Sequence, residues 1–366
     1  MTQLPKRGEN RRYRLGFNVA MYNVYVENKF ILEGIKYLSL KEGNTFFWEM
    51  LDRLNSVVPY FDCRYTRHNF EYYEQRYQGT GNMFKSESFI LLQNNQPFFA
   101  LIGSIIFGSN GKNQLCAYEV PSGLIEIPDA SRTQTKSIIK YLRTIIDSSS
   151  TEFIVKEQLF GGKISSAANY LLLERNYYSD SQYSYYINLS SSEATLKSNI
   201  RKSYHSLINW GTREMKINLL SSNNITWQDF LSFRDLHIRE SGKETRSLET
   251  WKKQYESVIH NEAFVVTAHI SETLVSAALF WISKTHCYYA VSASRRDMFE
   301  KPLIHSVLWK AILYAKSIGI LFFETGQCYP CNATKYIPSK KEKQIETLRS
   351  GFGGKTKISL ILSSSK

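Results

Sequence analysis

Apolar residues recur along the second half of the chain with the spacing of a helix and then of strands. Between Thr226 and Ile238 they recur at near-helical spacing, and Thr226 itself is a residue type that caps helix N-termini. The segments 263–270, 273–282 and 286–293 are short apolar runs separated by only two to three polar residues. Such short links are typical of an antiparallel meander. The second half is therefore predicted to combine an antiparallel sheet with flanking helices.

The predicted elements of the two halves follow nearly the same order. The second half adds helices over 192–210, 247–259 and 302–318, a strand over 320–324, a short basic helix after Pro338 and a last strand over 356–363. The first half predicts helices near 45–56, 66–78, 131–147 and 163–175, and strands near 87–93, 97–107, 115–120, 152–156 and 183–189. This repeated order predicts an α/β (α+β) fold of two similar domains, each a mixed, mostly antiparallel sheet with helices on both faces. The Ser-rich stretch 190–192 marks the predicted boundary between domains 1–190 and 191–366.

The composition is that of a folded chain, and the net charge indicates the class of partner. The 366 residues are 43% hydrophobic and 22% charged, which excludes a disordered tail, a collagen and a coiled coil. The formal net charge is +13, and a surplus of this size predicts an anionic partner. Much of the surplus lies in the two ends, residues 1–14 and 340–357, so the part between them is closer to balanced.

The chain lacks the sequence features of a membrane or secreted protein. No apolar run approaches the roughly 20 residues that a membrane-spanning helix needs. The polar, basic N-terminus does not have the form of a secretory signal. The five cysteines are an odd number and sparse for this length, which favours a reducing compartment over a disulfide framework. We therefore expect a cytoplasmic protein.

Two short motifs lack the context that their chemistry needs. Residues 353–356 (GGKT) match the end of a phosphate-binding loop, but Arg349 stands where the loop needs its first glycine, and a strand follows instead of a helix. Cys328 and Cys331 have the spacing of a thiol redox pair, but a thioredoxin-like domain carries that pair near its beginning, and a zinc site would need a second pair. The seven histidines show no ligand spacing, so we expect no catalytic metal.

Several local patterns occur in a consistent order across residues 190–360. They are LKSNIRKSY at 196–204, HIRESGK at 237–243 followed by Thr245, Arg246, Ser247 and Trp251, paired strands over 263–282, YYAVSAS at 288–294, FETG at 323–326 and LRSGFGG at 348–354. The ordered set resembles the FemAB-like branch of the GNAT acyltransferase superfamily, in which two GNAT domains stand in tandem. The resemblance implies that the second domain is the acyltransferase domain, with an acyl-CoA such as acetyl-CoA as co-substrate.

Two positions depart from the patterns that the resemblance implies. A conventional GNAT binds the pyrophosphate of acyl-CoA through a Gly-rich loop at a helix N-terminus. Here Arg296 fits that loop, but Phe299 and Lys301 replace its two glycines, which puts close approach of a pyrophosphate in doubt. Arg349 stands where the closing signature usually has Lys; it keeps the charge but cannot lose a proton.

The resemblance also implies where the chemistry lies. It places Tyr289 and Ser292 on a strand beside the acyl-transfer cleft. Tyr288 and Tyr289 are both candidates for a sugar or nucleobase platform, and strand alternation directs one of the two into the protein. Glu324, at the end of the next strand, is the expected base; the alternative is a carboxylate that caps the strand or pairs with a cation. His237 is the second candidate base, and its alternative is a satisfied core histidine.

Five cations are candidates for binding the phosphates of a donor or of a phosphorylated or nucleotide-linked acceptor. They are Arg201, Arg246, Arg296, Arg349 and Lys355. For each one, the alternative is a solvated basic face.

Three functions follow from these observations. The first is an N-acyltransferase that modifies an amino sugar or another cell-surface polysaccharide precursor. The second is an aminoacyltransferase that uses aminoacyl-tRNA and extends a peptidoglycan-type precursor, although the coiled-coil arm of its larger relatives is missing here. The third is a non-catalytic nucleic-acid-binding or scaffold protein with a degenerate GNAT fold and basic ends.

Overall fold

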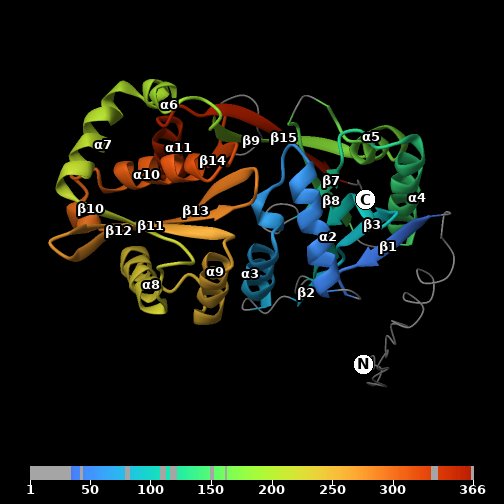
Figure 1. Ribbon diagram of the computed structural model, residues 1–366, viewed down its shortest axis with the longest axis horizontal. Coiled ribbons are helices and arrows are strands. Elements are labelled where there is room, and N and C mark those ends of the chain that lie inside the picture. Colours follow the sequence, from blue (N-terminus) through green and yellow to red (C-terminus); the bar gives the residue numbers. More distant parts are fainter. Residues whose placement is uncertain are drawn as a thin grey trace, which may run out of the picture.

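The computed structural model describes most of the chain and places it in one long sheet with helices on both faces (Figure 1). The described residues are 34–41, 44–78, 83–107, 113–115, 122–148, 152–160, 163–330 and 337–363. The basic segment 1–14, Cys116 and Cys331 lie outside them.

The strands form a continuous, mostly antiparallel sheet. Their order is β1-β3-β4-β7-β8-β15-β9-β14-β13-β12-β11-β10, and β2, β5 and β6 form a side branch. The bounds are β1 (Ile35–Ser39), β2 (Met83–Ser86), β3 (Phe89–Gln93), β4 (Gln96–Ile102), β5 (Ser104–Phe107), β6 (Asn113–Leu115), β7 (Gly123–Glu126), β8 (Glu152–Gln158), β9 (Tyr178–Asn188), β10 (Lys216–Leu220), β11 (Ala263–Ile270), β12 (Thr273–Ile282), β13 (His286–Ser294), β14 (Phe322–Cys328) and β15 (Lys355–Ser363). Among the described strands, the parallel pairs are β7–β8, β6–β8 and β13–β14.

Helices cover both faces of the sheet, as the repeated element order predicts. They are α2 (Asn44–Val57), α3 (Arg67–Gln78), α4 (Arg132–Ser148), α5 (Ser166–Glu174), α6 (Glu193–Asn199), α7 (Lys202–Glu214), α8 (Trp227–Ser241), α9 (Leu248–Ile259), α10 (Leu303–Ser317) and α11 (Lys340–Ser350), with short 3₁₀ turns η1 (Cys63–Tyr65) and η2 (Arg296–Met298). In Figure 1, α10 lies on one side of β11–β13 and α8 and α9 lie on the other. Each face buries its own apolar cluster, so the α/β architecture is confirmed.

The sheet joins the two halves because a strand from the end of the chain lies among strands of the first half. The last strand, β15, lies between β8 and β9 and is antiparallel to both. On β15, Leu362 is fully buried and belongs to the apolar cluster of the first half. Because β9 pairs with β15 on one side and with β14 on the other, the sheet continues from the first half into the second. The domain boundary at residues 190 and 191 stays a prediction.

Several predicted elements have different bounds in the structure; the strand over 97–107, for example, is divided into β4 and β5. The helix over 192–210 is interrupted between α6 and α7, because Ile200 is extended (ψ 141°) with its side chain buried, and the N–H of Arg201 donates to the carbonyl of Gly351 at 2.8 Å. The strand over 320–324 begins later, as β14, because the N–H groups of Ile320 and Leu321 bond to Ala315 and Thr285 rather than to a strand. Strands β1, β2 and β7 were not predicted, and residues 116–120 of the predicted strand 115–120 lie outside the described part of the chain.

None of the helices in the described part of the chain combines the length and the apolar character that a membrane crossing would demand.

Truncation of Leu362 should destabilise the whole protein although it lies near the end of the chain. Removing a buried Leu side chain costs about 2–5 kcal/mol, so Leu362→Ala should lower the free energy of unfolding by that amount in urea titrations. The matched control is Ile358→Ala on the same strand, where the side chain is 42% exposed and the expected cost is below about 1 kcal/mol. Equal effects of the two substitutions would mean that β15 does not close the first-half core.

Candidate functional site

The two parallel strands in the second half stop pairing part-way along their length. β13 and β14 pair at His286–Phe322, Cys287–Phe323 and Tyr288–Glu324, and no later pair between them is found among the described residues. On its other side β13 shifts register against β12 between Leu279 and Phe280. Such a bulge re-aims backbone and side chains and is common beside active sites. β13 and β14 therefore separate next to Tyr288 and Glu324.

Glu324 lies at this point and is almost completely buried. It accepts hydrogen bonds from Arg64 Nη2 at 3.0 Å and from the Tyr186 hydroxyl at 3.1 Å, and its Oε2 lies 3.2 Å from His286 Nε2. Burial alone would raise the pKa of Glu324, but the charge of Arg64, helped by His286, outweighs burial and holds the pKa well below its usual range. Glu324 is thus an ionised carboxylate paired with a cation, as the alternative interpretation of the sequence expects.

The first half of the chain supplies the other side of this cluster. Asp62 accepts from Arg64 Nη1 at 2.7 Å, and the pKa of Asp62 is also held well below its usual range against the effect of burial, chiefly by the Arg64 charge. The guanidinium of Arg64 lies 3.9 Å from the centre of the Tyr288 ring. The N–H of Cys63 donates to His286 Nδ1 at 3.2 Å. The buried cluster therefore joins both halves.

The opposite face of the same strands carries a second group of predicted residues. The Tyr289 hydroxyl donates to Ser292, and the Arg349 guanidinium lies 6.0 Å from the centre of the Tyr289 ring. Gly326 makes room for Arg349: its φ is +128°, and a Cβ there would lie 2.5 Å from Arg349 Cζ. Arg349 Nε is buried and has no hydrogen-bond partner. This face thus offers a fixed cation with an unused donor.

Arg201 lies close to the same group, whereas Lys355 is exposed. The break between α6 and α7 brings Arg201 to the end of α11, where its Nη2 is 3.4 Å from Ser350 Oγ. Its guanidinium also lies 5.1 Å from the centre of the Tyr204 ring. Lys355 begins β15 and points into solvent.

Three other predicted residues lie elsewhere. Arg296 is exposed on η2, and its backbone N–H donates to Glu240 at 2.8 Å. His237 and Arg246 both contact Trp251 of α9, with the His237 ring centre 5.3 Å and Arg246 Cζ 4.9 Å from the Trp251 ring. Burial, with the nearby charge of Arg246, lowers the pKa of His237 to about 4. His237 is therefore neutral near pH 7 and packs against an aromatic ring.

Solved structures share this architecture from end to end. FemX is 10% identical and aligns with a TM-score of 0.63, over 89% of this chain and 96% of its own. The chain has the fold of FemX. A protein of unknown function from Bacteroides thetaiotaomicron (8% identity, TM-score 0.54) covers 91% of this chain and 99% of its own. The C-terminal domain of a putative lysylphosphatidylglycerol synthetase from Agrobacterium fabrum (9% identity, TM-score 0.51) covers 87% and 92%.

These likenesses concern the fold. No family model matches the sequence, and neither does any curated protein. The FemX fold nevertheless confirms the tandem architecture that the sequence resemblance implies, because it extends over both halves of the chain.

Sequence reasoning missed the residues that surround Glu324. Asp62, Arg64 and Tyr186 carry no motif and are far from Glu324 in sequence, so only the fold brings them together. His286 had one available signal: it shares a strand face with Tyr288, two residues further on. Asp62, Cys63 and His286 could be considered as metal ligands, since their ligand atoms lie within 4.8 Å of one another. Their bonds to Arg64 and to the Cys63 N–H already occupy Asp62 and His286 Nδ1, so the set fits a metal poorly.

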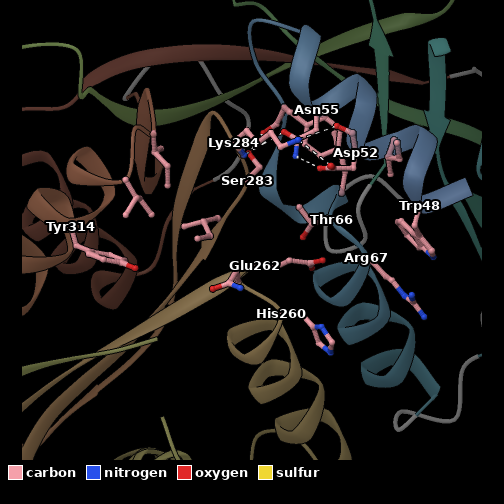
Figure 2. Close-up of a pocket in the computed structure, with 17 residues that line it drawn as sticks. Trp48, Asp52, Asn55, Thr66, Arg67, His260, Glu262, Ser283, Lys284 and Tyr314 are labelled. Atoms are coloured by element: carbon pink, nitrogen blue, oxygen red, sulfur yellow. Dashed lines mark hydrogen bonds and ion pairs between the residues drawn. The ribbon is translucent and has the colours of Figure 1, made fainter. Parts of the chain in front are cut away.

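A large cavity lies at the seam between the two halves (Figure 2). Its volume is about 550 Å³, and none of the predicted site residues lines it. In Figure 2 Lys284, in the turn before β13, reaches toward α2, where it pairs with Asp52 at 3.0 Å. Glu262 lies on the same seam and accepts from the N–H of His68 at 2.7 Å. These polar contacts add a second connection between the halves beside the Arg64 cluster.

A smaller cavity of about 310 Å³ lies in the first half and reaches Asp62. It is lined by Glu126 and Glu157, which accept from the N–H groups of Ser166 and Ser165 at the start of α5. Burial raises the pKa of Glu157 to about 7. The folded protein therefore keeps this acid protonated at pH values where the unfolded chain has lost the proton.

Glu157 should lower the stability of the protein as the pH rises from about 4.5 to 7, whereas the lowered pKa of His237 acts in the opposite direction. The raised folded pKa of Glu157 contributes stability that is present below the unfolded pKa and is lost as pH rises through the folded pKa. At 1.36 kcal/mol for each pKa unit, the contribution is about 3 kcal/mol. Urea unfolding at pH 5 and pH 8 isolates this contribution: on going from pH 5 to pH 8, the wild type should lose more stability, or gain less, than Glu157→Gln, which mimics the protonated acid. The exposed Glu174→Gln should behave as wild type; the same pH dependence in Glu157→Gln and wild type would reject the assignment.

Proposed function

We propose that the chain is an N-acyltransferase that moves an acyl group onto an amino group of a sugar or cell-surface polysaccharide precursor. The observation that carries this proposal is the separation of β13 from β14, with an ionised carboxylate on one face and an unpaired arginine nitrogen on the other. The FemX fold and the ordered sequence patterns support the same reaction class.

Acyl transfer to an amine requires alignment, proton removal and stabilisation of an oxyanion. Alignment by a rigid site contributes about 7–11 kcal/mol, and one oxyanion donor contributes roughly 10²–10³ in rate. Backbone N–H groups beyond the last β13–β14 pair are the expected oxyanion donors. Glu324, ionised and beside this point, would stabilise the positive charge that develops on the attacking nitrogen before it loses its proton. Arg349 and Arg201 would hold an anionic part of a substrate on the other face.

The loop before α10 bears on which molecule donates the acyl group. Its N–H groups already bond within the loop: Phe299 to Arg296 at 3.2 Å, and Lys301 to Met298 and Leu303 to Lys301 at 2.9 Å each. A pyrophosphate held in the conventional GNAT manner needs such N–H groups free. This observation favours the second candidate, an aminoacyltransferase that takes its acyl group from aminoacyl-tRNA. The fold of a putative lysylphosphatidylglycerol synthetase is in keeping with that candidate.

Donor binding distinguishes the candidates. If aminoacyl-tRNA is the donor, charged tRNA should raise the melting temperature and acetyl-CoA should not; if acyl-CoA is the donor, the result should be reversed. Ribonuclease treatment of an active extract should abolish activity only if aminoacyl-tRNA is the donor. Salt-sensitive binding to duplex nucleic acid without any response to either donor would instead indicate the non-catalytic scaffold and contradict acyl transfer.

Replacement of Glu324 should impair catalysis more than replacement of Asp62, the other carboxylate that binds Arg64. Glu324→Gln and Asp62→Asn each remove one carboxylate partner of Arg64, and each should cost about 3–5 kcal/mol of stability. Measured well below both melting temperatures, kcat should fall at least tenfold in Glu324→Gln and by much less in Asp62→Asn. Equal losses of kcat in the two variants would make the cluster structural and would remove Glu324 from the reaction.

A further inference from the structure

The two most exposed large apolar side chains among the described residues are Phe299 and Ile337. Their exposed fractions are 79% and 87%. Phe299 follows the end of β13, in the loop before α10, and Ile337 follows the end of β14, in the segment before α11. Because β13 and β14 are parallel neighbours, their C-terminal ends lie at one edge of the sheet. This is the edge toward which the two strands separate.

Local hydrogen bonds hold the backbone beside each of these two apolar side chains. The N–H of Phe299 donates to the carbonyl of Arg296 at 3.2 Å, and the N–H of Arg296 donates to Glu240 at 2.8 Å. In the other segment, Ser339 caps the start of α11 two residues after Ile337. Hydrogen-bonded turns therefore present both side chains to solvent. A single exposed apolar residue is ordinary on a protein surface, but two at this level at one edge indicate an interaction site.

Positive side chains accompany the two apolar residues. The same two segments carry five exposed cations with no carboxylate of a described residue within 4.0 Å: Arg296, Lys301, Lys340, Lys341 and Lys343. The acids of these segments are mostly engaged, since Asp297 pairs with Arg295 and Glu342 caps α11. Only Glu300 remains, exposed and without an ion pair to a described residue. This edge of the sheet therefore combines exposed apolar groups with a surplus of positive charge.

The combination discriminates between classes of partner. A nucleic acid would pair with the cations and could stack on Phe299, but it offers no contact suited to the aliphatic Ile337. A soluble phosphorylated ligand would leave both apolar side chains in water. The surface of an anionic bilayer takes up both kinds of group, because its headgroups attract Lys and Arg and its acyl chains accept apolar side chains. The chemistry of this edge therefore favours a membrane surface.

We propose that the edge formed by residues 295–301 and 337–343 binds the surface of an anionic membrane. Phe299 and Ile337 enter the boundary between headgroups and acyl chains, and the five cations meet the headgroups. Bound in this way, the protein turns the point where β13 and β14 separate toward the bilayer. An acceptor carried on a membrane lipid would then reach that point from the lipid side. This last consequence rests on the proposed function, whereas membrane binding does not.

Co-sedimentation of the full-length protein with lipid vesicles tests the proposal without an enzymatic assay. The wild type should bind vesicles of phosphatidylcholine mixed with phosphatidylglycerol and bind pure phosphatidylcholine much more weakly. Phe299→Ser and Ile337→Ser should each weaken binding about tenfold, because each removes a large apolar side chain from the lipid boundary. Lys341→Gln should weaken it about fivefold, as expected for one cation near an anionic surface. The matched control is Leu173→Ser on α5, where the apolar side chain is 71% exposed; it should bind as wild type.

Melting temperatures without vesicles control for folding, and all these variants should melt as wild type because the side chains are exposed. The proposal is overturned if the wild type does not bind the anionic vesicles, if Phe299→Ser and Ile337→Ser bind them as wild type does, or if Leu173→Ser loses as much binding as they do. Binding to duplex nucleic acid that depends on Lys341, without binding to vesicles, would assign the edge to a nucleic acid instead. Failure of the acyl-transfer assays with intact vesicle binding would reject only the proposed function.

Discussion

The contact between Arg64 and two buried carboxylates is the interaction on which the arrangement of this protein depends. Arg64 and Asp62 come from the first half, and Glu324 comes from the second. All of them are largely removed from water, where an unpaired charge costs several kcal/mol. The halves therefore cannot move apart at this point without leaving Glu324 uncompensated. The pair also sets the ionisation of Glu324, because the charge of Arg64 outweighs the effect of burial.

The sheet enforces the same relation through the backbone. β15 pairs with β8 and β9, and β9 pairs in turn with β14, so a ladder of hydrogen bonds leads from the first-half core to the strand that carries Glu324. A site built on central strands holds its side chains more accurately than one built on loops. The separation of β13 from β14 is thus held by paired strands on both sides, and polar side chains lie on both faces of the sheet at this point.

The two faces differ in electrostatic character. Glu324 offers negative charge among tyrosines on one face, and Arg349 offers positive charge with a free N–H on the other. In the loop before α10, the N–H groups of Phe299, Lys301 and Leu303 bond to carbonyls of the same loop.

The local pattern of the sequence was enough to predict most elements and the residue types at the strand ends. Thr226 and Ser247 cap their helices as predicted, and β11, β12 and β13 follow the apolar runs closely, because caps and periodicity act over a few residues. Glu324, Tyr289, Ser292 and Arg349 were identified through ordered local patterns, and the last three do lie together. Only the tertiary structure determines which residues these side chains contact. Arg64 reaches Glu324 from 260 residues away, and β15 enters the first half, since both are settled by packing and charge pairing between segments that share no local signal.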